Sequence, residues 1–357
     1  MPVKVAVNGS GTIGKRIVDS VLLNKDFKLV GVAKYKPDYQ AYLMIEKGIP
    51  VFVPRDRAGE FINSGIEPSG YIDYLFEEAD LIYDASPGGK GVLNKKIYEK
   101  HGKPVVFQGG EDPEIAEISY STFCNYSDAI NKKNVRVVSC NTTGMLRLLC
   151  ILEKEYGVKK ALAVIIRRAA DPKEDNRGPV NSILLDPPEI PSHHGVDART
   201  VAPWLNITSA AVVVPTTLMH MQFIEVELKS PVKKDEVLEV LGRYRRFLLI
   251  DSARTGIDST SKLMELARDA GRMRGDIYEN SVFIDTVKIE DTRLYLFQGI
   301  HQESIVIPEN MDVAYAILGL EHDQYRVVEK TDSLLGVGSL EKLIKTSRHR
   351  LKGENHE

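Results

Sequence analysis

The N-terminal stretch VKVAVNGSGTIGKRIVDSVLLN constrains the fold most strongly. An almost continuous apolar run meets the pattern G-x-G-x-x-G at Gly9, Gly11 and Gly14, and apolar residues at helical spacing follow. This order of strand, glycine turn and helix is the dinucleotide-binding fingerprint, because the glycines let the backbone approach a pyrophosphate at the helix N-terminus. The motif therefore predicts a dinucleotide site, and a plain structural turn is the weaker alternative.

Further apolar runs after the fingerprint predict a parallel sheet. They are apolar throughout, and helical patterns separate several of them, as at Val92–His101. Strands without polar alternation are typical of a parallel sheet that helices cover on both faces. The strands are expected at residues 27–35, 51–54, 80–86, 104–110 and 134–140.

The character of the sequence changes after Cys140. A helix at 145–156 leads to long segments with period-two patterning, at 161–170, 210–230 and 280–302, which indicate an antiparallel sheet. Helices are predicted at 235–247 and 258–272, with a last one opening on Pro308 and a polar, frayed end from 345 to 357. The predicted fold is an α/β Rossmann nucleotide-binding domain (1–139) plus an α+β domain with a mainly antiparallel sheet (140–305).

Composition excludes several classes of protein. The chain has 357 residues with a net charge of -3, no basic block and no run of about 18 apolar residues. Nucleic acid and membrane are therefore not expected as partners. The three cysteines lack C-x-x-C spacing, which argues against a disulfide framework and against a zinc site. We expect no metal, and a reducing, cytoplasmic setting.

Cys140 has the position of a reactive cysteine. It ends a predicted strand at the sheet edge where doubly wound folds bind ligands, and NTTG after it supplies capping groups for a helix. A helix N-terminus should lower the pKa of the thiol and favour the nucleophilic thiolate. Cys150 instead lies in the apolar run MLRLLCIL and is typical of core packing, and Cys124 has no evident partner.

A cysteine nucleophile usually has a histidine base, and His220 is the best candidate among eight histidines. The segment VVPTTLMHMQFIEVEL places it mid-strand between two methionines; a core histidine is the alternative reading. Arg167 and Arg168 at a strand end, with a His193-His194-Gly195 turn in the long proline-rich loop 171–203, could form an anion pocket. A solvated charge pair beside an ordinary loop turn is equally consistent.

Lys34 bears on the choice of cofactor. About 20 residues after the fingerprint, an NAD-specific protein normally has Asp or Glu for the ribose 2′-hydroxyl. This chain has Lys34 there, and Lys36 follows. Because an ammonium attracts a 2′-phosphate that a carboxylate would repel, NADP becomes possible beside NAD. A solvated strand-end lysine is the alternative.

Together these motifs resemble archaeal glyceraldehyde-3-phosphate dehydrogenase. The resemblance covers nearly the whole chain through the fingerprint, SCNTTG, RRAADPKEDNRGPVNSI, PSHHG, PTTLMHMQF and QGIHQES, in this order. The bacterial and eukaryotic branch has Thr-Thr-Asn after the cysteine, whereas this chain has Asn-Thr-Thr-Gly. The resemblance therefore favours the archaeal branch.

The resemblance implies phosphorylating oxidation of glyceraldehyde 3-phosphate to 1,3-bisphosphoglycerate with NADP or NAD, through a thiohemiacetal and a thioester on Cys140. It makes Cys140 the nucleophile and His220 the base. It also implies a homotetramer and a Rossmann domain that is completed by the C-terminal helix within 306–357. The substrate and phosphate contacts implied or inferred are Ser139, Asn141, Thr142, Arg167, His193, His194 and Gly195. The cofactor contacts are Gly9, Gly11, Thr12, Ile13, Gly14, Lys34, Gly110, Arg168 and Gln302.

Two other readings stay open at this point. Aspartate-semialdehyde dehydrogenase and N-acetyl-glutamyl-phosphate reductase share the thioester chemistry but recognise a substrate that carries a carboxylate. A nicotinamide-sensing binding protein with a merely structural Cys140 is a different class, in which alkylation would not favour Cys140 over Cys124.

Overall fold

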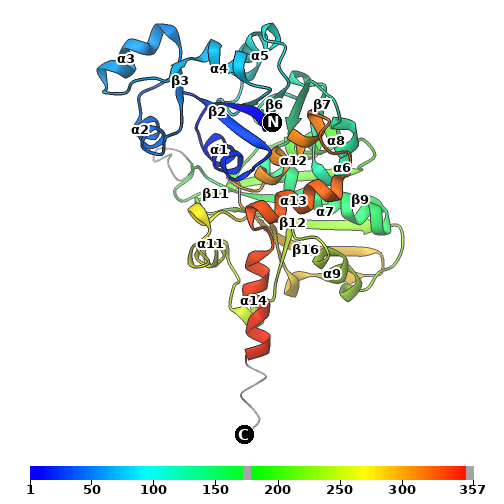
Figure 1. The fold of residues 1–357 in the computed structure, drawn as a ribbon. Helices are drawn as coiled ribbons and strands as arrows, with labels where there is room; N and C mark the ends of the chain where they lie inside the picture. Colours follow the sequence, from blue (N-terminus) through cyan, green and yellow to red (C-terminus); the bar gives the residue numbers. More distant parts are fainter. Residues whose placement is uncertain (172–177, 351–357) are drawn as a thin grey trace. The chain divides into compact units, whose positions relative to one another are not determined.

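The computed structural model describes residues 1–171 and 178–350, and the chain divides into two compact units (Figure 1). The first unit is Met1–Ser139 with Ile307–Leu334, and the second is Cys140–Val306 with Leu335–Glu357. The C-terminal segment is thus shared between the units, and the helices of 307–334 belong to the first. The part of the predicted polar end from 351 to 357 lies outside the described residues.

The first unit contains an entirely parallel eight-stranded sheet in the order β4-β3-β2-β1-β5-β6-β8-β7. The order reverses between β1 and β5, which is where doubly wound sheets bind ligands. The strands are β1 (Val3–Asn8), β2 (Phe27–Ala33), β3 (Val51–Val53), β4 (Gly70–Tyr71), β5 (Leu81–Asp84), β6 (Val105–Gln108), β7 (Ile118–Tyr120) and β8 (Asn134–Val137).

Helices pack on this sheet and bury its apolar strands. A core cluster joins Leu75 and Phe76 of one helix to Ile82 and Phe107 of the strands. The helices are α1 (Gly14–Leu23), α2 (Tyr39–Glu46), α3 (Ala58–Asn63), α4 (Ile72–Glu78), α5 (Gly91–Lys100), α6 (Thr122–Asn125), α12 (Ile307–Ile317) and α13 (Gln324–Leu335). The predicted Rossmann-like parallel sheet is confirmed. The short strands β4 and β7 and the helix α13 were not predicted.

The second unit contains a mixed, mostly antiparallel sheet in the order β10-β11-β9-β12-β16-β14-β13, with β15 paired to β16. Two of its pairs, β11 with β9 and β13 with β14, are parallel. The strands are β9 (Val158–Arg168), β10 (Leu184–Leu185), β11 (Ile207–Val214), β12 (His220–Leu228), β13 (Phe247–Ile250), β14 (Asn280–Phe283), β15 (Lys288–Glu290) and β16 (Arg293–Ile300). The predicted α+β class is confirmed.

Several predicted boundaries in the second unit are wrong. Segment 210–230 forms two strands, and 280–302 forms three, because turns interrupt the apolar pattern. The helix predicted to reach residue 247 ends at Gly242, and β13 follows. His220 is the first residue of its strand and not in the middle. The helices are α7 (Cys140–Tyr156), α8 (His193–Val201), α9 (Lys234–Gly242), α10 (Ser252–Thr255), α11 (Thr260–Asp269) and α14 (Ser339–Arg350).

Buried and half-buried residues alternate strictly along β12, and this alternation decides which side chains contact helix α7. Residues His220, Gln222 and Ile224 are buried on one face, and the residues between them are half-buried on the other. Gln222 pairs across the sheet with Gln298 of β16, and it contacts Asn141 of α7. Because side chains alternate with period two, His220 and Gln222 share the face covered by α7.

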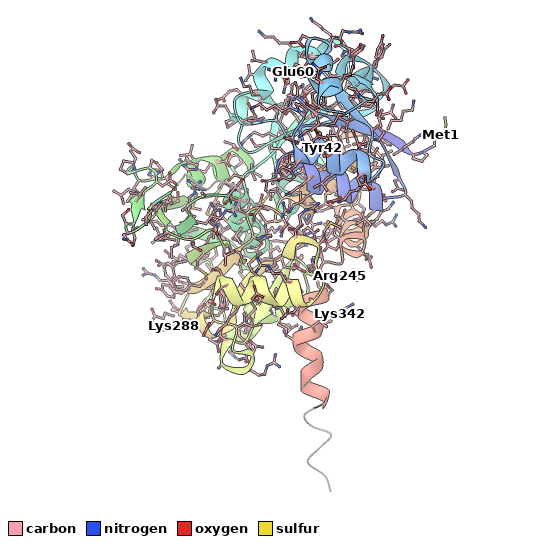
Figure 2. The ribbon with its side chains drawn as sticks, turned by 90° about the vertical axis from the view of Figure 1, so that its left-hand side faces the viewer. Met1, Tyr42, Glu60, Arg245, Lys288 and Lys342 are labelled. Atoms are coloured by element: carbon pink, nitrogen blue, oxygen red, sulfur yellow. The ribbon has the colours of Figure 1, made fainter. Side chains whose placement is uncertain are left out.

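The start of α14 is fixed to the second unit by buried polar contacts. Arg272 donates to the Gly336 carbonyl at 2.8 Å, and Glu279 accepts from Arg272 and from the Gly338 main-chain N–H, each at 2.8 Å. Leu340 joins an apolar cluster of this unit. Figure 2 shows Arg245 beside the beginning of this helix, in agreement with its close approach to Gly338. The helix predicted to open on Pro308 is therefore not the last one, because α13 and α14 follow it.

The cysteines differ from expectation. Cys140 is a free thiol, whereas Cys124 and Cys150 are disulfide-bonded. The expectation that the chain has no disulfide is therefore wrong, since cysteine spacing alone does not show which side chains meet. Among the described helices, none is long and apolar enough to cross a bilayer.

Candidate functional site

The glycine fingerprint has the geometry that a dinucleotide requires. Gly9 follows β1 with φ +102°, and a Cβ there would lie 2.7 Å from the Ala85 carbonyl oxygen. A Cβ on Gly14 would lie 2.1 Å from the Gly9 oxygen, so only glycine lets α1 begin this close to the strand. Gly11 has open space where its Cβ would be. The turn is thus closely packed on the protein side and open beside Gly11, which suits a pyrophosphate.

The other predicted cofactor residues of the first unit lie around the same sheet edge. Ile13 is the N-cap of α1 and provides no side-chain cap, so it does not compete for the helix N–H groups. The Thr12 carbonyl accepts from Arg16 at 2.8 Å. Gly110 comes two residues after β6, beside Gly88. Each of these positions follows a strand end, as the fingerprint predicts.

Lys34 is not a solvated surface lysine. It is buried, and its Nζ is 2.7 Å from Oδ1 of Asp38, which also caps α2. This ion pair offsets part of the positive charge that was expected to attract a 2′-phosphate. Lys34 and Asp38 therefore have to be considered together as candidate ribose contacts.

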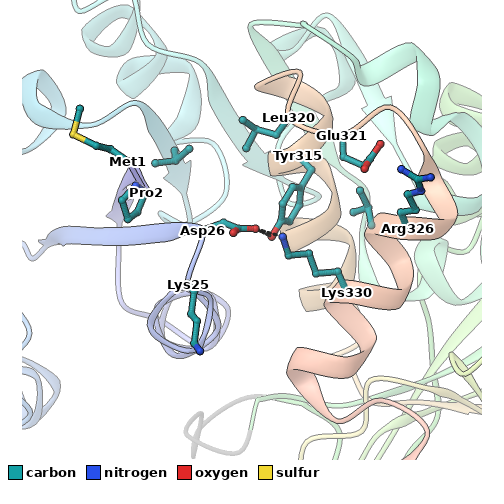
Figure 3. Close-up of a pocket in the computed structure, with 11 residues that line it drawn as sticks. Met1, Pro2, Lys25, Asp26, Tyr315, Leu320, Glu321, Arg326 and Lys330 are labelled. Carbon is teal, nitrogen blue, oxygen red and sulfur yellow. Dashed lines mark hydrogen bonds and ion pairs between the residues drawn. The ribbon is translucent and has the colours of Figure 1, made fainter.

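A separate pocket of about 590 Å³ lies in the first unit at the opposite edge of the sheet (Figure 3). Lys330 and Tyr315 both contact Asp26, which precedes β2. The six residues of β1 put this pocket roughly 20 Å from the fingerprint. No predicted site residue lines it.

Cys140 begins α7 and is partly exposed. Burial raises the pKa of its thiol to about 11. The guanidinium groups of Arg167 and Arg168 act to lower this pKa, and so does a main-chain hydrogen bond from Asn141. The expected lowering of the Cys140 pKa is therefore wrong in this structure. Loss of hydration of the thiolate outweighs the helix N-terminus and both cations.

Alkylation of ligand-free protein by iodoacetamide should show this raised pKa. Because only the thiolate reacts, the rate at Cys140 should rise about tenfold per pH unit from pH 7 toward pH 10. Arg167→Met removes a cation that favours the thiolate and should lower the rate at every pH. The measurement is the fraction of Cys140 modified, by mass spectrometry of peptides. A rate that levels off near neutral pH would contradict the prediction.

His220 is buried at the start of β12, and its ring has a defined tautomer. Its Nδ1 accepts a hydrogen bond from the Arg168 main-chain N–H at 3.0 Å. The neutral ring therefore carries its proton on Nε2, and this atom is buried without a partner among the described residues. Burial and the neighbouring arginines hold the His220 pKa well below its ordinary value. Neutral His220 thus provides a donor at Nε2.

Arg168 is the centre of a buried cluster of charged and polar side chains, which we call the charge hub. Its guanidinium binds Glu303 and Asp171, and it also donates to Gln302 Oε1 and to the Thr217 carbonyl. Its side chain is 1% exposed and that of Glu303 is 6% exposed. His301 Nε2 lies 3.0 Å from Glu303. In this structure the predicted cofactor residues Arg168 and Gln302 bind each other.

Arg167 and His193 are the next two predicted substrate residues. Arg167 forms an ion pair with Asp186, while its Nε is buried without a partner among the described residues. The rings of His193 and His194 lie against each other, with centroids 3.9 Å apart and planes tilted by 32°. Burial and Arg167 lower the pKa of His193. A cation and two uncharged histidines are thus gathered near Cys140, whose pKa also responds to Arg167.

The remaining predicted substrate residues lie on α7 and α8. Ser139 directly precedes α7. Thr142 donates to Asp197 of α8 at 2.8 Å, and Asn141 Nδ2 lies 3.3 Å from His194 Nε2. His193, His194 and Gly195 form the first turn of α8 and not a loop turn, which corrects the sequence reading. A Cβ on Gly195 would lie 2.6 Å from Ser209 Oγ, so this glycine brings α8 against β11.

Sequence reasoning missed the polar residues behind the site. Glu303, Asp171 and Asp186 bind the two predicted arginines, while buried amides at Gln222 and Gln298 contact α7. One signal was available, because Gln222 stands two residues after His220 on an otherwise apolar strand face. The acidic partners have no local signal.

The fold and the site together define a class of protein. One unit has a dinucleotide-binding parallel sheet, and the other places a free cysteine at a helix start among arginines and uncharged histidines. Residues 139–270 match the family model described as glyceraldehyde 3-phosphate dehydrogenase, C-terminal domain. The chain belongs to the glyceraldehyde-3-phosphate dehydrogenase family, and the predicted archaeal type is confirmed.

Three relatives illustrate how far this likeness extends. Proteins named glyceraldehyde-3-phosphate dehydrogenase from Aeropyrum pernix and Hyperthermus butylicus are each 48% identical to this chain. The alignments cover 94% of this chain and 98% and 97% of those proteins. Glyceraldehyde-3-phosphate dehydrogenase from Sulfolobus acidocaldarius is 45% identical, over 89% of this chain and 93% of its own length.

Proposed function

We propose that this protein oxidises glyceraldehyde 3-phosphate with inorganic phosphate, using a nicotinamide dinucleotide. The observation that carries the proposal is the free Cys140 at the start of α7, beside two arginines and two buried histidines whose pKa values are lowered. Family membership favours this substrate over the carboxylate-bearing substrates of the rival dehydrogenases. A binding protein with a structural cysteine would not require this surrounding set of charges.

In the proposed reaction, the Cys140 thiolate adds to the aldehyde carbon and the carbonyl oxygen becomes an alkoxide. An oxidised nicotinamide dinucleotide supplies the hydride acceptor and a positive charge. As the hydride leaves, the alkoxide re-forms a carbonyl and gives a thioester on Cys140. Inorganic phosphate attacks this thioester, the Cys140 thiolate leaves, and the acyl phosphate is released. The proton released overall is that of the attacking hydrogen phosphate, because the Cys140 thiolate is regenerated unchanged.

The proposed role of His220 differs from that of a base acting through Nε2. Because Nδ1 already accepts from the Arg168 main-chain N–H, the neutral ring has its proton on Nε2. A second proton at Nδ1 would face that N–H group and break the hydrogen bond. The tautomer supports a donor that stabilises the alkoxide on the substrate. The role of His220 as base stays a prediction that this geometry does not favour.

The proposed anion contacts are Arg167, His193 and His194. Arg167 provides a permanent charge and His194 an uncharged donor, both suited to phosphate oxygens. Asn141, Thr142 and Ser139 at or next to the N-terminal turn of α7 would contact the substrate beside Cys140. The proposal covers these residues as a set. It does not divide them between the substrate phosphate and the attacking phosphate.

Both NADP and NAD are proposed as cofactors, held by the fingerprint and by Lys34, with Gly110, Arg168 and Gln302 as further contacts. The alanine variant Lys34→Ala should weaken NADP binding more than NAD binding, because only NADP has the 2′-phosphate that an ammonium attracts. Dissociation constants from fluorescence titration of both cofactors measure this. Asp38→Asn, which frees the ammonium, should favour NADP. If Lys34→Ala weakened the binding of NADP and NAD equally, the assignment of Lys34 to the 2′-phosphate would be overturned.

The function is tested by following the formation of reduced nicotinamide with glyceraldehyde 3-phosphate, with and without inorganic phosphate. Reduction that requires phosphate supports the proposal. Reduction that proceeds equally without phosphate would mean that the thioester is hydrolysed, and the enzyme would be non-phosphorylating. Activity with aspartate semialdehyde and none with glyceraldehyde 3-phosphate would overturn the substrate.

A homotetramer is proposed from the resemblance. Exposed apolar side chains on the segment before α8 support self-association: Val180 is 82% exposed, Leu185 68% and Ile190 69%. Sedimentation velocity measures the mass that decides it. A cytoplasmic location stays a prediction. The spacing of the cysteines no longer supports it, because Cys124 and Cys150 are disulfide-bonded.

A further inference from the structure

Three buried amides form a chain of hydrogen bonds behind α7, which we call the amide relay: Asn280, Gln298 and Gln222. Each of them is 0% exposed. Asn280 Nδ2 donates to Gln298 Oε1 at 2.9 Å, and Gln298 Nε2 donates to Gln222 Oε1 at 2.8 Å. Gln222 Nε2 then donates to Asn141 Oδ1 at 3.0 Å. All donors in the relay therefore point the same way, toward Asn141.

Main-chain carbonyl groups fix this direction. The Gly144 carbonyl accepts from Asn280 Nδ2 at 2.7 Å and from Gln298 Nε2 at 3.2 Å. The Asn141 carbonyl accepts from Gln222 Nε2 at 3.0 Å. Because a carbonyl oxygen can only accept, the nitrogen of each amide must face it, and none of the three amides can turn over without losing a bond.

The relay decides how Asn141 meets His194. Since Asn141 Oδ1 accepts from Gln222, its Nδ2 faces His194 Nε2, at 3.3 Å. His194 Nε2 must then accept, which places the proton of the neutral ring on Nδ1. Burial lowers the pKa of His194 to about 3, so the ring stays neutral near pH 7. Nδ1 is buried and has no partner among the described residues.

An unpartnered buried donor costs free energy unless a ligand uses it. We propose that the amide relay fixes the side chain of Asn141 and thereby the tautomer of His194, so that neutral His194 offers an Nδ1–H donor to a ligand oxygen. The relay residues are positioning residues, since they act through Asn141 and His194. That the ligand oxygen belongs to an aldehyde or a phosphate group rests on the proposed function.

His194 and His220 then have opposite tautomers for the same reason. A fixed partner occupies one ring nitrogen of each, Nε2 in His194 and Nδ1 in His220, and leaves the other as the donor. His194 is also among the groups that act to lower the pKa of His220. The site thereby holds two neutral donors suited to acceptor oxygens, without adding positive charge beside the thiolate.

Nitrogen NMR of protein with isotope-labelled histidine tests the relay directly, because protonated and accepting ring nitrogens have different shifts. His194 signals are assigned by their loss in His194→Asn. Wild-type protein should show the proton on Nδ1. Asn141→Asp keeps the shape but puts an acceptor against Nε2, so the proton should move to Nε2. The exposed Asn206→Asp makes the same chemical change away from the site and should leave His194 unaltered.

Gln222→Met tests the relay without touching His194. Asn141 loses its fixed orientation, so both tautomers of His194 should be populated. The KM for glyceraldehyde 3-phosphate should rise roughly tenfold, the effect of losing one oriented donor, with a smaller change in kcat. A proton on Nε2 in wild type, or an unchanged tautomer in both variants, would overturn the inference. Correct tautomers in a protein without phosphate-dependent activity would overturn the proposed function and support the relay.

Discussion

Cys140→Ser should abolish phosphate-dependent reduction of the cofactor, with kcat lowered by roughly a thousandfold or more, as when a nucleophile is removed from a catalytic unit. The reason is chemical. Among the described residues, His220 does not offer a base to a serine hydroxyl, because its neutral tautomer has its proton on Nε2, the ring nitrogen without a partner there. Without an anionic nucleophile no thioester forms, and phosphate has nothing to attack.

The measurement is single-turnover reduction of the nicotinamide together with mass spectrometry of an acylated enzyme. Wild-type protein without phosphate should accumulate the acyl group on Cys140, and Cys140→Ser should not. Cys140→Ala should be as inactive as Cys140→Ser, and both should keep wild-type cofactor affinity by titration. Phosphate-dependent turnover that survives in Cys140→Ser would show that Cys140 is not the nucleophile.

Arg168→Met should reduce the free energy of unfolding by about 3–5 kcal/mol, the usual cost of removing one partner from a buried ion pair. Arg168 and Glu303 are both almost fully buried, and their carboxylate and guanidinium groups contact each other. The guanidinium also helps to hold the Glu303 pKa well below its ordinary value. Without it, His301 would remain as the polar partner of this buried carboxylate among the described residues.

Urea unfolding of the whole chain measures this loss as a shift in the midpoint. The matched control is Arg243→Met, which breaks an exposed pair with Glu239 and should leave the unfolding midpoint almost unchanged, because solvent screens such a pair. Adding Glu303→Gln to Arg168→Met removes the Glu303 carboxylate that has lost its ion-pair partner. The double variant should therefore recover part of the free energy of unfolding. Equal shifts of the urea midpoint in Arg168→Met and Arg243→Met would contradict the prediction that the ion pair of Arg168 contributes more to stability than an exposed pair.

Local sequence patterns predicted the parallel sheet of the first unit, apart from the short strands β4 and β7. The fingerprint and uninterrupted apolar strands carry their own signal, because a buried parallel strand needs apolar residues on both faces and a tight turn needs glycine. The second unit was harder. Its class followed from alternation, but α8 was hidden in a proline-rich stretch and β13 was read as the end of a helix. Short elements depend on packing, which outweighs their weak local preferences.

The sequence by itself determined the dinucleotide fold and the family, since glycine spacing, strand periodicity and ordered motifs are local properties of the chain. Only the tertiary structure decided the state of each group. Loss of hydration raises the pKa of Cys140 to about 11, opposite to the effect of a helix N-terminus. The tautomers of His194 and His220 depend on partners that are distant in sequence, Asn141 and Arg168. Burial and hydrogen-bond direction arise from contacts across the sheet, and no local pattern encodes them.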